Sequence, residues 1–273
     1  MAKEKSVKIY HLIILDNSAS MASVTMQTIE GVNTQLKTIK ADADEFKDQE
    51  HIFCLVTFGD KIKYDVWKQA ANTIEELTNK TYIANGWSTA MCDAIGGGIN
   101  GLRNEIVEEL KNEDTKVFVN IFTDGYENSS KEFDAKDCKE LIEEVQQTGQ
   151  WVVAMVGCEE NVFEEAAKMG IHQGNTVKYA RGAVGTQVAM QHLSRARHKM
   201  SDDVSKGLYS SDTTTSYMAD TVVPTATNVD PLNPNNMLIT ANDGHENIND
   251  INMNIDAGDL INKAADVEDE NNE

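Results

Sequence analysis

Residues 9–20 read IYHLIILDNSAS, an apolar run that stops at Asp16 and is followed by the hydroxyl side chains of Ser18 and Ser20. The run has the length and composition of a strand buried on both faces. In an open α/β sheet, ligands bind beyond the carboxyl ends of the strands. Oxygen atoms alone at positions i, i+2 and i+4 suit a hard divalent cation better than zinc. Taken by itself, the triplet fits equally well a turn that caps the following helix.

Apolar periodicity divides residues 1–200 into alternating strands and helices. We expect buried strands at residues 9–15, 51–58, 117–123, 151–157 and 176–180, and a charged edge strand at residues 61–67. We expect helices at residues 23–48, 91–110, 134–149, 162–169 and 184–199, and a short one near residues 73–77. This order predicts an α/β, doubly wound fold: a mostly parallel six-stranded sheet with one antiparallel edge strand, filling a single domain over residues 1–200.

Residues 201–273 have a different composition. They contain all three prolines of the chain and carry 15 acidic and 2 basic residues, out of a total net charge of -21. We expect this acidic, Asn/Asp-rich tail to be disordered, with residues 248–261 as its one candidate interaction segment. A calcium loop there is excluded, because Ile255 and Ile261 stand where glycine and glutamate are required.

The net charge and the spacing of the cysteines limit the possible partners and the expected cellular location. The acidic balance of both parts argues against nucleic acid and anionic membrane surfaces as partners. The apolar run before Asp16 lacks a cleavage site for a signal peptide, and no stretch reaches the length of a membrane span. Four scattered cysteines form no Cys-x-x-Cys pair, which favours buried, reduced thiols and a cytoplasmic protein.

Two further residues are predicted to join the triplet at the same edge of the sheet. Asp124 directly follows the apolar strand at residues 117–123, and Thr89 begins the helix that precedes that strand. Because parallel strands end along one edge and crossovers are right-handed, these loops should converge with the loop after Asp16. Two carboxylates and three hydroxyls would suit magnesium, with manganese or calcium as alternatives.

This set resembles the metal-ion-dependent adhesion site of von Willebrand factor type A domains. Further motifs resemble the soluble bacterial and phage branch of that family, in matching order over about residues 6–200: Met21, Gly31-Val32-Asn33, residues 88–96, residues 122–130 and Leu193-Ser194-Arg195-Ala196. The resemblance implies metal ligation by Asp16, Ser18, Ser20, Thr89 and Asp124. It also implies that the remaining coordination position takes an Asp or Glu of a protein partner.

The resemblance therefore implies a non-catalytic, metal-dependent protein-binding module. An alternative is an assembly protein in which the metal only stabilises the fold and the acidic tail mediates interaction. A carboxylate of the tail could also occupy the open metal position within the same chain. An enzyme that uses the ion as a Lewis acid is disfavoured, because no spacing brings a general base to the site.

Single motifs suggest other catalytic functions, but the surrounding sequence excludes them. The glycines of residues 96–101 match the dinucleotide fingerprint but fall inside an expected helix, where close packing explains them better. A phosphatase of the haloacid dehalogenase type needs an aspartate where Ser18 stands, and no serine-hydrolase elbow is present. His11 and His51 lie in apolar strands and are interpreted as core residues.

The neighbours of the site have open roles. Asp93, one turn after Thr89, is expected to form hydrogen bonds rather than to ligate a metal. Trp87, Tyr126, Glu127 and Asn128 flank the site. They could either contact a partner or pack over the end of the sheet.

Overall fold

The computed structural model describes residues 6–158 and 162–219. A six-stranded sheet has the order β3-β2-β1-β4-β5-β6, and only the pair of β2 and β3 is antiparallel. Its strands are β1 (Val7–Asp16), β2 (Gln49–Phe58), β3 (Ile62–Ala70), β4 (Thr115–Thr123), β5 (Trp151–Gly157) and β6 (Thr176–Lys178). The predicted mostly parallel sheet with one antiparallel edge strand is confirmed.

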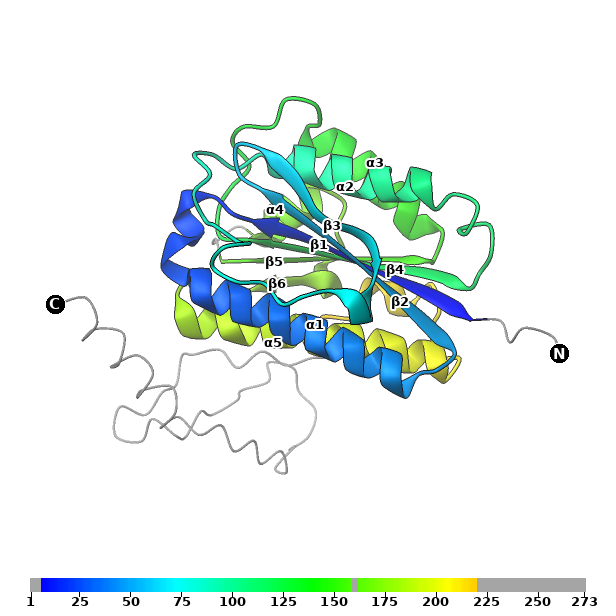
Figure 1. The fold of residues 1–273 in the computed structure, drawn as a ribbon. Coiled ribbons are helices and arrows are strands. Elements are labelled where there is room, and N and C mark those ends of the chain that lie inside the picture. Colours follow the sequence, from blue (N-terminus) through cyan, green and yellow to red (C-terminus); the bar gives the residue numbers. More distant parts are fainter. Residues whose placement is uncertain (1–5, 159–161, 220–273) are drawn as a thin grey trace, which may run out of the picture. The chain divides into compact units, whose positions relative to one another are not determined.

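Five α-helices within the described residues cover the sheet on both faces (Figure 1). They are α1 (Thr25–Glu45), α2 (Met91–Glu105), α3 (Ala135–Gln147), α4 (Val162–Lys168) and α5 (Ala183–Ser205). Figure 1 shows α1 and α5 side by side on one face and α2 and α3 on the other. A short 3-10 helix, η1 (Ala19–Val24), links β1 to α1.

The two helical layers explain why the inner strands are apolar throughout. Ile9, Ile13 and Leu15 of β1 face the core formed with α1 and α5, whereas Leu12 and Ile14 face the core formed with α2, α3 and α4. Each of these side chains is fully buried, which stabilises the fold by about 1.5–3 kcal/mol per residue. A strand flanked by helices on both sides thus shows no alternation of polar and apolar residues.

Strand register brings several strand ends to one edge. Asp16 at the end of β1 lies opposite Phe58 at the end of β2, and Thr123 at the end of β4 lies opposite Gly157 at the end of β5. The loops that leave this edge, which we call the rim, include η1, residues 59–61, 86–90, 124–134 and 179–182. The rim is the edge at which the sequence predicted a binding site.

The glycine run at residues 96–101 lies inside α2, as interpreted from the sequence. A Cβ atom on Gly96 would lie 2.3 Å from the ring of Phe133, and one on Gly98 would lie 3.4 Å from Ile14. Glycine therefore lets α2 approach both the sheet and the loop before α3. Nothing in this context resembles a phosphate-binding turn.

The short helix expected near residues 73–77 is wrong. One 3-10 turn, η2 (Ala71–Thr73), is followed by extended chain. The side chain of Asn33 in α1 accepts a hydrogen bond from the Leu77 backbone N–H and donates one to the Leu77 carbonyl, at 2.7 and 2.9 Å. An amide side chain from a distant helix thus satisfies the backbone in place of helical bonds, and local periodicity carries no trace of it.

The domain boundary expected at residue 200 is too early. Helix α5 continues to Ser205, and Tyr217 and Met218 are 1% and 2% exposed within the core on the α1/α5 side. Residues 201–219 are thus part of the folded domain. The disorder expected for residues 201–273 is therefore wrong for residues 201–219, and residues 220–273 lie outside the described residues.

Two smaller expectations hold, except that Cys158 is half-buried where four buried thiols were expected. Cys54, Cys92, Cys138 and Cys158 are free thiols, and all but Cys158 are buried. The rings of His11 and His51 are buried, stacked at 5.2 Å and joined by a hydrogen bond of 2.9 Å.

In the described part of the chain, no helix combines the length and the apolar character that a membrane span requires.

Candidate metal centre

The carboxylate of Asp16 is fixed at the end of β1. It is fully buried, accepts a hydrogen bond from the Ser18 backbone N–H at 2.7 Å, and accepts a second from the Thr123 hydroxyl at 2.6 Å. Burial raises the pKa of Asp16, and the hydrogen bonds from Thr123 and Ser18 oppose that shift. A positive charge nearby would offset the cost of keeping this carboxylate ionised.

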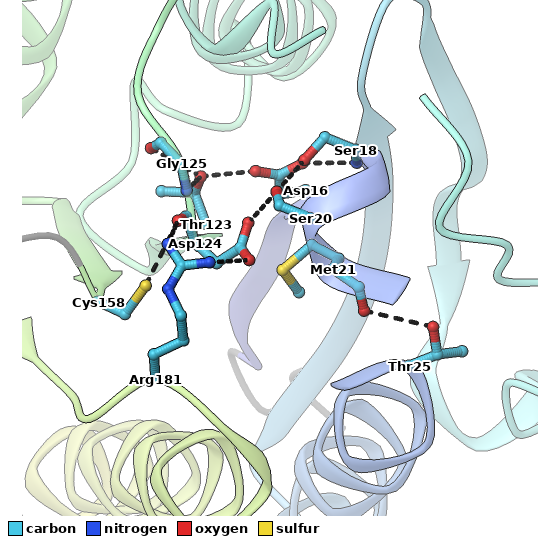
Figure 2. Close-up of polar contacts among 10 residues, drawn as sticks. All are labelled: Asp16, Ser18, Ser20, Met21, Thr25, Thr123, Asp124, Gly125, Cys158 and Arg181. Carbon is cyan, nitrogen blue, oxygen red and sulfur yellow. Dashed lines mark hydrogen bonds and ion pairs between the residues drawn. The ribbon is translucent and has the colours of Figure 1, made fainter. Parts of the chain in front are cut away.

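Ser18 and Ser20 turn their hydroxyls toward the end of β4 rather than onto a helix. The two Oγ atoms lie 3.0 Å apart, and Ser20 Oγ donates to Asp124 Oδ1 at 2.5 Å (Figure 2). Ser18 precedes η1 without a side-chain capping bond, and α1 begins after Val24, which has none either. The helix-capping alternative for the triplet is therefore wrong.

The Thr89 loop is held beside the triplet through its backbone. Gly86 exchanges backbone hydrogen bonds with Asn17 and Ala19, at 3.0 and 2.8 Å. A Cβ atom on Gly86 would lie 2.9 Å from the Cα of Gly59, so the two loops touch at positions where only glycine fits. This contact fixes the chain that leads into Thr89.

Asn128 joins Thr89 to the loop after β4. Its side-chain oxygen accepts the Thr89 N–H at 2.9 Å, and its own N–H donates to the Thr89 carbonyl at 3.1 Å. Thr89 Oγ1 lies 3.6 Å from the point that a Cβ on Gly125 would occupy, next to Asp124. Thr89 and Asp124 are 4% and 3% exposed. The structure thus links Asp16, Ser18, Ser20 and Asp124 and places Thr89 near Gly125, the residue after Asp124, whereas metal ligation by the five stays a prediction.

Asp93 and Glu127 fasten the loop after β4 to the start of α2. Asp93 accepts backbone hydrogen bonds from Lys131, Glu132 and Phe133, each at 2.8 Å. Glu127 accepts from the backbone N–H groups of Cys92, Ser129 and Ser130 at 2.7–2.8 Å. These contacts hold the pKa of both carboxyls below their usual values against the effect of burial. Asp93, expected to form local hydrogen bonds, instead forms hydrogen bonds that reach a loop 38–40 residues away in sequence, and Glu127 also forms such a long-range bond, to Cys92.

Two aromatic side chains of the rim are exposed. Trp87 is 93% exposed and Tyr126 is 43% exposed. Of the four neighbours, Glu127 and Asn128 form hydrogen bonds within the domain, whereas the side chain of Trp87 is almost fully exposed and that of Tyr126 partly exposed.

Sequence reasoning missed Arg181, which lies in the loop between β6 and α5. Its guanidinium donates to Asp124 Oδ2 at 3.1 Å and to the Asp124 carbonyl at 2.7 Å (Figure 2). A usable signal was present, because Arg181 follows the last strand and so leaves the sheet at the rim.

The donor atoms of the site are all oxygen. Asp16 and Asp124 supply carboxylates, and hydroxyls come from Ser18, Ser20 and Thr89. Among the described residues, no three or more His, Cys, Asp or Glu side chains cluster as they would around a zinc ion. The donor set therefore fits a hard cation that keeps water ligands and does not fit a zinc centre.

Comparisons with known proteins give distant structural matches at low identity. No protein-family model matches the chain, and no curated protein does. Proximal thread matrix protein 1 of the mussel byssus is 13% identical over 71% of this chain and 49% of its own, with a TM-score of 0.49. A von Willebrand factor type A protein from Catenulispora acidiphila is 14% identical over 69% and 42%, with a TM-score of 0.43.

Manganese-loaded TRAP protein from Plasmodium vivax is 14% identical over 65% of this chain and 69% of its own, with a TM-score of 0.44. A second structure of the mussel protein has zinc in the motif named MIDAS. This chain spans about half the length of the mussel chain that it matches. At such identities and TM-scores, these likenesses carry no conclusion about this chain.

Proposed function

We propose that this protein is a von Willebrand factor type A-like, non-catalytic module that binds a protein partner through a divalent cation. Asp16, Ser18, Ser20, Thr89 and Asp124 would hold the cation directly or through water. The observation that carries the proposal is the hydrogen bond from Ser20 to Asp124. It joins the hydroxyl pair that follows β1 to the carboxylate that follows β4, and so concentrates oxygen ligands at one point of the rim.

The ligand chemistry supports binding of an outside carboxylate. Three of the five donors are neutral hydroxyls, and two carboxylates at most neutralise a divalent cation. Such a cation remains attractive to a further anion, so an Asp or Glu of a partner is the ligand that fits best. We propose Mg²⁺ as the resident ion, because it prefers oxygen ligands and retains exchangeable waters.

The exposed aromatics extend the contact surface. Trp87 stands two residues before Thr89 and Tyr126 two residues after Asp124, so both flank the site in sequence and lie on the rim. Exposed aromatic side chains are enriched among the residues that carry binding energy in protein interfaces. The four free thiols favour a cytoplasmic location for this interaction.

Affinity capture from the source cell tests the proposal. Wild type and Asp124→Asn would each be used as bait, with and without a chelator. We expect one set of partners to be lost both on substitution and on chelation. Partners that survive both treatments would contradict the proposal and favour binding through the acidic tail.

Thermal unfolding offers a direct test of the cation. Addition of Mg²⁺ or Mn²⁺ should raise the Tm of wild type, because a ligand that binds only the folded state stabilises it. The rise should be absent in Ser18→Ala. It should persist in Ser205→Ala, a matched control on the exposed C-terminal end of α5.

A further inference from the structure

Arg181 forms two hydrogen bonds with Asp124, one of the proposed cation ligands. One guanidinium nitrogen contacts the Asp124 carboxylate at 3.1 Å, and another contacts the carbonyl of the same residue at 2.7 Å. The arginine side chain is 54% exposed, whereas that of Asp124 is 3% exposed. A buried carboxylate is thus paired with a cationic group that reaches in from solvent.

Both oxygens of this carboxylate are already in use. Oδ1 accepts the Ser20 hydroxyl and Oδ2 accepts Arg181 (Figure 2). A divalent cation that draws on Asp124 must share the carboxylate with the guanidinium or displace it. Arginine keeps its charge at every physiological pH, so this competition cannot be relieved by deprotonation.

The formal charges of these side chains indicate how competition between Arg181 and a cation for Asp124 affects the binding of an acidic ligand. The formal charges of Asp16, Asp124 and Arg181 alone sum to one net negative charge, and a divalent cation changes this sum to one net positive charge. One carboxylate from outside then restores neutrality. Without the arginine, the cation alone would neutralise the site, and an added carboxylate would leave it negative.

We propose that Arg181 makes cation binding and acidic-ligand binding depend on each other: it weakens the cation when bound alone and strengthens the hold on an incoming carboxylate. This inference rests on the proposed function and specifies its regulation. Binding of two ligands that each favour the other is reciprocal, so the acidic ligand should raise cation affinity by the factor that the cation raises ligand affinity.

The loop that carries Arg181 has a backbone conformation that depends on glycine. Gly182, the next residue, has a φ of 116°, which glycine adopts freely and other residues rarely do. It also precedes the first residue of α5. When a cation loosens the contacts of Arg181, residues 179–185 should gain backbone freedom.

A titration with Mn²⁺, followed by electron paramagnetic resonance, tests the inference. The proteins would be full-length wild type, Arg181→Gln, Arg181→Lys and Arg195→Gln, which removes the same charge from the exposed surface of α5. We expect Arg181→Gln to bind Mn²⁺ on the order of tenfold more tightly than wild type, since a nearby like charge is removed. Arg181→Lys and Arg195→Gln should stay near wild type.

Acetate serves as the carboxylate probe, with chloride at equal ionic strength as its control. Acetate should raise Mn²⁺ affinity more in wild type than in Arg181→Gln. Hydrogen exchange gives an independent readout: Mn²⁺ should speed exchange in residues 179–185 of wild type, and this segment should already exchange fast in Arg181→Gln.

The outcomes separate this inference from the proposed function. Equal Mn²⁺ affinity in wild type and Arg181→Gln, both folded, overturns the inference and leaves the cation site standing. Absence of Mn²⁺ binding in both proteins overturns the cation site and the inference with it. An acetate effect of equal size in both proteins overturns the proposed dependence of one ligand on the other.

Discussion

The hydroxyl of Thr123 donates a hydrogen bond of 2.6 Å to the buried carboxylate of Asp16, across 107 residues of sequence. It joins the ends of the two central strands, β1 and β4. Thr123 is not among the proposed cation ligands, yet it sets the orientation of one of them. The geometry of the site therefore depends on a residue that lies outside the set of proposed ligands.

Substitution Thr123→Val should test this support. Valine keeps the shape of the side chain but leaves one oxygen of a buried carboxylate without its hydroxyl donor, which costs about 1–3 kcal/mol. We expect a lower free energy of unfolding in urea and weaker Mn²⁺ binding. Thr34→Val, the same change on the exposed face of α1, should alter the free energy by less than about 0.5 kcal/mol. Equal effects of the two substitutions would refute the role assigned to Thr123.

The buried histidine pair should make the fold sensitive to acid. Burial, and then the charge of Arg197, lower the pKa of His51 from 6.5 to about 4 and that of His11 well below its usual range. Between the unfolded pKa of 6.5 and the folded pKa of about 4, the unfolded chain binds more protons than the folded chain. The free energy of unfolding is therefore highest above pH 6.5 and falls as the pH drops toward 4. For His51 alone the loss at pH 5 is about 2 kcal/mol.

Urea unfolding at pH 7.5 and pH 5.0 measures this loss. Burial raises the pKa of Asp16 and of Asp42, so the folded chain binds protons at these carboxyls more readily than the unfolded chain does. As the pH falls, these two groups therefore favour the folded state, which opposes the effect of the histidines. A double variant, His11→Phe with His51→Phe, isolates the histidine contribution, because it replaces two stacked rings by apolar rings of similar shape. It should show a smaller fall between the two pH values, and an unchanged fall would contradict the assignment.

Two glycines of α2 should respond oppositely to alanine. A Cβ on Gly96 would lie 2.3 Å from the Phe133 ring, so Gly96→Ala should destabilise the fold by about 1–3 kcal/mol. On Gly101 the nearest atom would be 3.7 Å away, in Trp67, which is ordinary contact. Gly101→Ala should therefore stabilise the helix by about 0.5–1 kcal/mol. Tm values of the two variants decide whether packing, rather than flexibility, explains the glycine run.

Truncation should distinguish the folded domain from the acidic segment. A chain ending at residue 219 should keep the wild-type Tm, whereas one ending at residue 200 should lose stability, because it lacks the end of α5 and the buried Tyr217 and Met218. If a tail carboxylate competes for the cation, the chain ending at residue 219 should bind partners more tightly. Unchanged partner and Mn²⁺ affinities would remove the tail from the mechanism.

The sequence predicted the parts of the site that follow from topology. Asp16 and Asp124 end apolar strands, and parallel strands end along one edge, so their approach needed no knowledge of side-chain contacts. The position of Arg181 at the rim also follows from topology, but its contact with Asp124 could not be predicted, since that contact depends on the path of a loop and the reach of a long side chain. The extended chain that Asn33 holds at Leu77 and the late core residue Tyr217 also depend on contacts between distant segments, which leave no periodic pattern.

The contact between Gly59 and Gly86 has a consequence for the strength of binding. Because the two backbones touch, the loop that leads to Thr89 is already ordered in the folded protein. The conformational entropy of this loop is lost during folding and is not lost again when a partner arrives. Pre-organisation of this kind favours docking with little backbone rearrangement, so the affinity of the rim for a partner should be limited by the quality of its contacts.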